Sequence, residues 1–281
     1  MTSAPEPTEP RLHTLSLGSA GPRIAFLHGL FGQGRNWTQI AKAVIGADGT
    51  GARALLVDLP DHGRSPWSHE FSFESYADQV AATLRAAGGE DRWTVVGHSI
   101  GGKVAMVLAL AHPDLVERLA VVDVAPKSYG DLSRFAGYIS AMRALPLLEI
   151  GDRADAEERF ADVDPDPGVR AFLLQNLRRE GGSWRWQSNV ALFAADAARG
   201  GDSAIADFPA AVLDHPPYDG PVLWLAGADS GYVRPGDAEQ MRALFPSARL
   251  VSVKGVGHWV HSQAPEVTVE ALRALLAKPA G

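Results

Sequence analysis

Short apolar segments alternate with longer helical patterns along most of this chain. The apolar segments lie at 23–27, 53–57, 93–96, 118–123, 221–226 and 249–253. Their length is typical of strands, and the nearly continuous apolar character of the inner segments is typical of strands that are buried on both faces. Helical patterns lie at 73–87, 100–111, 237–244 and 264–277, and an alternating segment at 12–18 predicts an antiparallel edge strand. The sequence therefore predicts an α/β fold, with a mostly parallel sheet and helices on both faces.

One region departs from this alternation. Residues 127–215 contain three helical patterns, which Pro- and Gly-rich stretches such as DVDPDPG interrupt, and no convincing strand. Such an excursion between two strands predicts an inserted helical lid over the carboxyl edge of the sheet, where open α/β proteins bind ligands. We expect residues 1–126 and 216–281 to form the core, with a disordered tail at 1–10.

The composition narrows the possible partners and chemistry. The net charge is −7 and no tract of Lys and Arg occurs, which argues against a nucleic-acid partner. No apolar run approaches the roughly 18–20 residues of a membrane span, and the N-terminus lacks the apolar part of a signal peptide, so we expect no membrane partner and a cytoplasmic location. The chain has no cysteine and none of its nine histidines has metal-ligand spacing. We therefore expect no disulfide, metal or thiol nucleophile.

A nucleophile motif stands at the end of one predicted strand. The segment Gly97–Gly101, GHSIG, follows the apolar run that ends at Val96 and opens the helical pattern at 100–111. This context is that of the G-x-S-x-G nucleophile elbow, a sharp turn in which glycines avoid collisions with the neighbouring strand and helix. The motif predicts Ser99 as a nucleophile and the amide of Ile100 as an oxyanion donor. The alternative is an ordinary turn serine.

A second loop follows the first parallel strand. In HGLFG, the amide of Leu30 is the predicted second oxyanion donor, with Phe31 as the alternative. We expect His28 to brace this loop by hydrogen bonding. A third loop, GVGHWVH, follows the last strand, and its glycines allow His258 to reach Ser99 as the base. We expect His261 to be structural and His98 to point away from the site.

These motifs together resemble a known family over nearly the whole chain. They are HGLFG, DLPDHGRS, GHSIGGK, VVDVAP, FLLQNLRREGGSWRW and GVGHWVH. They are similar to those of the α/β-hydrolase superfamily, and in particular of small bacterial carboxylesterases related to α/β-hydrolase domain protein 11. The resemblance implies an α/β-hydrolase fold and hydrolysis of small or short-chain acyl esters by a Ser–His–acid triad without a cofactor.

The acid of the triad has two candidates. Many α/β-hydrolases take it from the loop after the strand that follows the lid, but Ser230 occupies the corresponding position here and Asp229 is displaced by one residue. The branch that this chain resembles implies an acid at the end of the strand after the nucleophile helix, which is Asp123. We predict Asp123, with Asp229 as the alternative. The competing interpretations are a turn residue for Asp123 and a surface carboxylate for Asp229.

The sequence gives less information about the substrate than about the triad. Phe31, Trp184, Trp186 and Trp259 are the candidate pocket residues, and Phe135, Tyr138 and Phe193 are further lid aromatics for which simple packing is the alternative. Arg178, Arg179 and Arg185 are candidates for binding an anionic group or, alternatively, solvated surface residues. The same triad serves thioesterases, carbon–carbon bond hydrolases or lyases, cofactor-free haloperoxidases and slow-turnover ligand receptors. We expect a small acyl ester as the substrate, and a monomer or homodimer.

Overall fold

A seven-stranded sheet forms the centre of the computed structural model, which describes residues 11–47, 49, 51–130 and 133–278. The strand order is β1-β3-β2-β4-β5-β8-β9, and only β1 is antiparallel to its neighbour. The strands are β1 (Thr14–Leu17), β2 (Arg23–Leu27), β3 (Arg53–Val57), β4 (Trp93–His98), β5 (Val116–Val122), β8 (Val222–Gly227) and β9 (Ala248–Val253). Each predicted strand is present, with ends within two residues of the expected ones.

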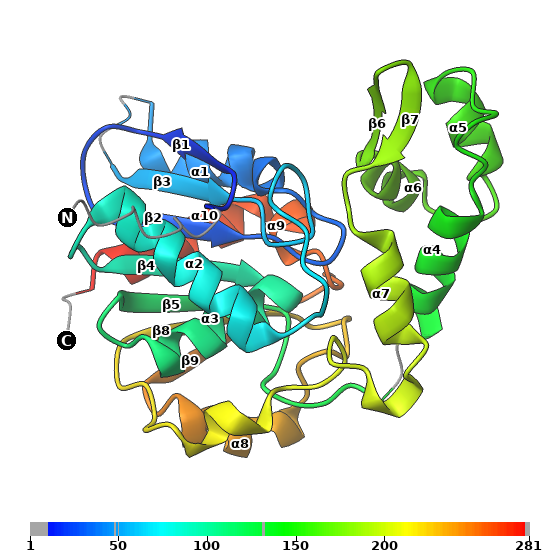
Figure 1. Ribbon diagram of the computed structural model, residues 1–281. Helices are drawn as coiled ribbons and strands as arrows, with labels where there is room; N and C mark the ends of the chain where they lie inside the picture. The colour runs from blue at the N-terminus through cyan, green and yellow to red at the C-terminus, as the bar shows by residue number, and fades with distance from the viewer. Residues whose placement is uncertain (1–10, 48, 50, 131–132, 279–281) are drawn as a thin grey trace, which may run out of the picture.

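Helices cover both faces of this sheet, as Figure 1 shows. They are α1 (Thr38–Ile45), α2 (Phe73–Gly88), α3 (Ile100–Ala111), α8 (Ala238–Leu244), α9 (Val260–Gln263) and α10 (Pro265–Leu276), with short 3₁₀ turns η1 (Gly34–Trp37) and η4 (Pro235–Asp237). Successive residues of a strand enter different cores: Ala25 and Leu27 pack on the α2–α3 side, Ile24 and Phe26 on the α1–α10 side. This double burial explains the nearly continuous apolar character of the inner strands, whereas the edge strand β9 is largely exposed.

Two of the helices that cover the sheet were not predicted from the sequence. The first is α1, which buries Ile40, Ala41, Val44 and Ile45 at a helical spacing against the sheet. The second is the single turn α9, which is too short to produce a periodic pattern. The helical pattern predicted at 100–111 is confirmed, because α3 ends at Ala111 and the following His112, which precedes Pro113, is no longer helical.

The region between β5 and β8 is an insertion that packs beside the core at the carboxyl ends of the strands (Figure 1). Its helices are α4 (Ser133–Ala144), α5 (Arg153–Arg159), α6 (Pro167–Leu174) and α7 (Val190–Ala197), followed by 3₁₀ turns η2 (Gly200–Asp202) and η3 (Ala210–Asp214). Apolar and polar contacts link it to the core. The Phe193 ring packs against Phe31, the side chain of Asn176 contacts the loop after β2, and that of Asn189 contacts the loop after β3.

The expectation that this insertion contains no strand is wrong. β6 (Leu177–Glu180) and β7 (Ser183–Trp186) form an antiparallel hairpin around Gly181 and Gly182, which have φ angles of +57° and +88°. Two consecutive residues with positive φ make the tight turn that suits a two-residue hairpin, and glycine adopts it without a steric penalty. In the part of the chain that the structure describes, no helix combines the length and apolar character required to cross a membrane.

Candidate active site

Ser99 lies in a sharp turn between β4 and α3. Its φ angle of +54° is unusual for a residue with a side chain. The turn is possible because its neighbours are glycines: a Cβ on Gly97 would lie 2.1 Å from the carbonyl oxygen of Gly101, and a Cβ on Gly101 would lie 2.4 Å from that of His28. Strand, turn and helix therefore pack at backbone distance, and they hold the buried Ser99 in one place at the carboxyl edge of the sheet.

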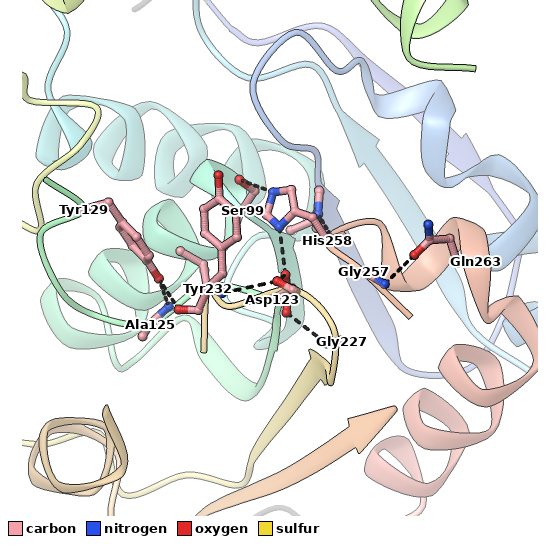
Figure 2. Close-up of polar contacts among 12 residues, drawn as sticks. Ser99, Asp123, Ala125, Tyr129, Gly227, Tyr232, Gly257, His258 and Gln263 are labelled. Atoms are coloured by element: carbon pink, nitrogen blue, oxygen red, sulfur yellow. Dashed lines mark hydrogen bonds and ion pairs between the residues drawn. The ribbon is translucent and has the colours of Figure 1, made fainter. Parts of the chain in front are cut away.

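A continuous chain of hydrogen bonds joins Ser99 to two distant residues. The Nε2 atom of His258 lies 3.1 Å from the Ser99 Oγ, and its Nδ1 atom lies 2.8 Å from an Asp123 carboxylate oxygen (Figure 2). These residues come from the turn after β4, the end of β5 and the loop after β9. A hydroxyl, an imidazole and a buried carboxylate in this order can deprotonate the hydroxyl and stabilise the imidazolium that forms.

The carboxylate of Asp123 is fully buried and receives two further hydrogen bonds. The Gly227 amide donates to Oδ1 at 2.9 Å, and the Ser230 hydroxyl donates to Oδ2. Ser230, at the position where the sequence resemblance would place an acid after the strand that follows the insertion, therefore contacts the carboxylate that comes from β5. Asp229 is exposed and, among the described residues, its carboxylate makes no hydrogen bond or ion pair to His258. The structure therefore brings Asp123, and not Asp229, to the histidine.

The His258 ring is fixed by neighbours that the sequence did not reveal. The Tyr232 ring stacks on it with centroids 4.1 Å apart and planes at 21°. Tyr129 donates its hydroxyl proton to the Tyr232 carbonyl at 2.8 Å and accepts the Ala125 amide at 2.7 Å. Burial raises the pKa of Tyr129, so the hydroxyl keeps the proton that it donates. The Gly257 amide donates to the Gln263 side chain at 2.7 Å, which ties the histidine loop to α9 (Figure 2).

The loop after β2 lies on the other side of Ser99. The Gly32 amide donates to the Gly29 carbonyl at 2.8 Å, and Phe31 has a φ angle of +61°. Asn176 of the insertion donates to the Phe31 carbonyl at 2.7 Å and accepts from the Gln33 side chain at 2.9 Å. Among the described residues, the amides of Leu30, Phe31 and Ile100 donate to no other group. They are thus available to an external acceptor. Asn176 stands in the segment FLLQNLRREGGSWRW, but the sequence assigned it no role.

Three further histidines surround the site: His28 and His98 are buried, and His261 is half-buried. His28 contacts the Gly29 carbonyl through Nδ1 at 2.8 Å and accepts the Leu59 amide on Nε2 at 3.0 Å, so it braces the loop after β2 as expected. His98 lies with its Nε2 2.9 Å from the His258 carbonyl. Burial lowers the pKa of His28 and of His261 to about 4, and that of His98 well below its usual value. These rings stay neutral near pH 7.

Two cavities meet at Ser99. The outer cavity, of about 520 Å³, is lined by Phe31, Trp259 and His258, and the inner cavity, of about 340 Å³, lies beside Ile100. Leu30 and Phe135 line both cavities.

Most of the other aromatic residues that we considered in the insertion pack away from the two cavities. Among the described residues, Trp184 and Trp186 line neither cavity, in contrast to the predicted pocket. Their indole N–H groups donate instead to the carbonyls of Ile150 and Met142, at 3.0 and 2.9 Å, inside the insertion. Phe193 is also buried against its neighbours, whereas Tyr138 lines the outer cavity.

The charged residues near the hairpin and the acidic residues of the chain suggest no further site. Arg178, Arg179 and Arg185 are exposed, and Arg178 donates to the Gln187 side chain. Within the described ranges, no cluster of three or more His, Asp or Glu residues is placed to hold a metal ion.

Comparison with known proteins identifies the family of this chain. The family model described as "alpha/beta hydrolase fold" matches residues 22–145 and 170–265. The sn-1-specific diacylglycerol lipase ABHD11 of Mus musculus is 38% identical over 260 residues, which cover 91% of this chain and 81% of that protein. Esterase YbfF of Escherichia coli is 28% identical over 253 residues, which cover 90% of this chain and 92% of that enzyme.

The structural comparison leads to the same family. The solved structure of a marine microorganism esterase superposes with a TM-score of 0.87 at 30% identity, covering 95% of this chain and all of that one. The relatives are esterases and lipases, and the predicted fold and family are confirmed. The chain belongs to the α/β-hydrolase family, and it is a hydrolase of the esterase or lipase type.

Proposed function

We propose that this protein is a serine carboxylesterase that hydrolyses small or short-chain acyl esters through an acyl-enzyme. Ser99 is the nucleophile, His258 the general base and Asp123 the orienting acid. The observation that carries the proposal is the hydrogen-bonded chain from the Ser99 hydroxyl through His258 to the buried Asp123 carboxylate. The proposal retains the cytoplasmic location and the monomeric or dimeric state expected from the sequence.

The acylation step begins when the Ser99 Oγ attacks the ester carbonyl carbon. Its proton passes to His258 Nε2, which lies 3.1 Å away. Asp123 accepts the Nδ1–H of His258, fixes the tautomer that leaves Nε2 free to take the proton, and stabilises the imidazolium. The Gly227 amide and the Ser230 hydroxyl hold the carboxylate in its orientation toward His258.

Negative charge develops on the carbonyl oxygen as the tetrahedral intermediate forms. The Ile100 amide, at the positive end of α3, and the Leu30 amide stabilise it, with the Phe31 amide as the alternative second donor. The imidazolium then returns its proton to the alcohol oxygen, and the alcohol leaves. A water molecule, deprotonated by His258, attacks the acyl carbon, and collapse of the second intermediate releases the acid and restores Ser99.

The insertion acts as a lid over this site in our proposal. Its residues Phe135, Tyr138 and Val169 line the outer cavity, and the cavities next to Ser99 are small. We therefore expect acyl chains of about two to six carbons to be preferred, because each misfitting methylene costs about 1–3 kcal/mol. Hydrolysis of an ester of the kind named in the mouse relative, a diacylglycerol, is the second candidate function, favoured by that relative's 38% identity.

The test is the turnover of p-nitrophenyl butanoate by wild type and by Ser99→Ala. The variant should lose activity by a factor on the order of 10⁶ while unfolding at the wild-type temperature. Thioesters, carbon–carbon bond substrates and haloperoxidase assays run in parallel distinguish the other activities that the same triad supports. Wild-type turnover in Ser99→Ala, or efficient hydrolysis of long-chain triglycerides by the wild type, would contradict the proposal.

A further inference from the structure

The two cavities at Ser99 differ in what closes them. The inner cavity ends at Lys103, which lies one helical turn after Ser99 and is only 2% exposed. Its ammonium group donates to the carbonyls of Ala206 at 2.8 Å, Ile205 at 3.4 Å and Asp207. The ring of Tyr129 lies 4.9 Å from it. A long apolar chain would have to displace this bonded, buried group, so the inner cavity has a fixed end.

The outer cavity continues into a wider space. It shares Asn36, Val169, Phe172, Trp259 and His261 with a groove of about 1160 Å³ between η1–α1, α6 and α9–α10. These shared lining residues give a chain that enters the outer cavity a direction in which to extend toward the groove.

The position of His258 assigns the two halves of an ester to these spaces. Among the described residues, His258 lines the outer cavity and not the inner one. The Tyr232 ring, which stacks on the imidazole, forms part of the inner wall. A general acid must lie within hydrogen-bond reach of the leaving oxygen. The alcohol therefore leaves through the outer cavity, and the acyl group occupies the inner one.

We propose that the enzyme takes short-acyl esters of longer, apolar alcohols, with the acyl length limited by the inner cavity that ends at Lys103. This inference rests on the proposed Ser99–His258–Asp123 mechanism and adds the direction in which the ester binds. It also separates two substrate classes that the triad alone treats alike, esters with a long acid and esters with a long alcohol.

The test compares two isomeric esters, octyl butanoate and butyl octanoate. They have the same atoms and nearly the same hydrophobicity, so a difference in kcat/KM reports orientation. We expect octyl butanoate to have the higher kcat/KM by about tenfold or more. Equal values, or a preference for butyl octanoate, would overturn the inference while leaving the esterase proposal intact. Loss of both activities together with p-nitrophenyl butanoate hydrolysis would contradict the proposed function as well.

Two variants locate the determinant. Ile205→Ala enlarges the inner cavity and keeps the Ile205 carbonyl that Lys103 contacts, so it should raise kcat/KM for butyl octanoate relative to octyl butanoate by several-fold. The matched control, Phe172→Ala, removes a side chain that lines only the outer spaces, and its effect should depend on the alcohol. If Phe172→Ala rather than Ile205→Ala shifts the acyl-length preference, the two halves of the ester are assigned in reverse.

Discussion

The carboxyl edge of the sheet and the insertion contribute to this site in different ways. The sheet supplies Ser99 and Asp123 from the ends of two adjacent strands, both with positive φ angles, of +54° and +52°. The backbone therefore fixes the positions from which the Ser99 and Asp123 side chains extend. The insertion instead reaches the site through single side chains such as Asn176, and through walls of the cavities. The comparison teaches that, in the mechanism we propose, the core determines the chemistry, while the insertion adjusts the oxyanion loop and selects the substrate.

The unusual backbone angles are held by the sheet. The Ser99 amide donates to the Val122 carbonyl at 3.0 Å, and the Asp123 amide donates to the Leu225 carbonyl at 2.8 Å. A conformation of this kind costs on the order of 1–3 kcal/mol and persists only where the surroundings enforce it. Parallel strands that are buried on both faces provide that enforcement, and the polar links of the insertion do not.

The largest expected effect tests the acid from the core. Asp123→Asn should lower kcat by a factor of about 10³–10⁴, because an amide cannot fix the His258 tautomer or stabilise the imidazolium. The matched control is Asp229→Asn, whose exposed side chain lies outside the hydrogen-bonded chain, and it should stay near wild type. Steady-state kinetics on p-nitrophenyl butanoate measures both. A collapse in Asp229→Asn alone would transfer the acid role to that residue.

A second effect concerns the stability of the core at acid pH. Burial lowers the pKa of His62 to about 3, and those of His28 and His261 to about 4, from the usual 6.5. Between pH 6.5 and about 4 the unfolded chain binds protons at these rings and the folded chain does not. The free energy of unfolding should therefore fall as the pH falls, by up to about 1.4 kcal/mol per pH unit for each ring.

Urea denaturation at several pH values between 7 and 4 measures this slope. Carboxylates also titrate in this range, so the informative comparison is with His62→Phe, which removes one of the buried rings. Its slope should be smaller than that of the wild type by about one proton. An unchanged slope would mean that His62 does not enter the folded core as a neutral ring.

A smaller effect tests the link from the insertion to the oxyanion loop. Asn176→Ala removes the hydrogen bond to the Phe31 carbonyl, and we expect kcat to fall about tenfold with little change in KM, because the loop acts mainly in the transition state. The matched control is Asn189→Ala, which breaks the 2.7 Å bond from the insertion to Asp61, away from Ser99. It should lower stability without a comparable loss of kcat. Equal losses of kcat would show that general docking of the insertion is responsible.

The same contrast decides how much could be read from the sequence. Strand-end motifs such as GHSIG are local, because the turn, the glycines and the helix start lie within a few residues, and the fold that they predict is confirmed. The Asn176 contact joins residues 145 positions apart. Phe31 stands in HGLFG and Asn176 in FLLQNLRREGGSWRW, but neither motif shows that the two residues meet. Nothing local could have revealed it.

Other omissions had a local signal. The Gly181–Gly182 pair predicts the β6–β7 hairpin once the flanking residues are considered as strands, and the apolar spacing of α1 is helical. The positions of Trp184 and Trp186 could not be predicted, because an aromatic side chain in an insertion packs internally as readily as it lines a cavity. Their carbonyl partners, Ile150 and Met142, lie more than thirty positions earlier in the chain.

The most direct test of the central claim, that the core edge activates Ser99, is covalent labelling with a short-chain alkyl p-nitrophenyl phosphonate followed by peptide mass spectrometry. We expect one phosphonyl group per chain, on the peptide that contains Ser99, with loss of ester hydrolysis in proportion to labelling. Ser99→Ala should take up no label, and Asp229→Asn should be labelled at the wild-type rate. Labelling of another residue, or full activity in a chain labelled at Ser99, would contradict the account.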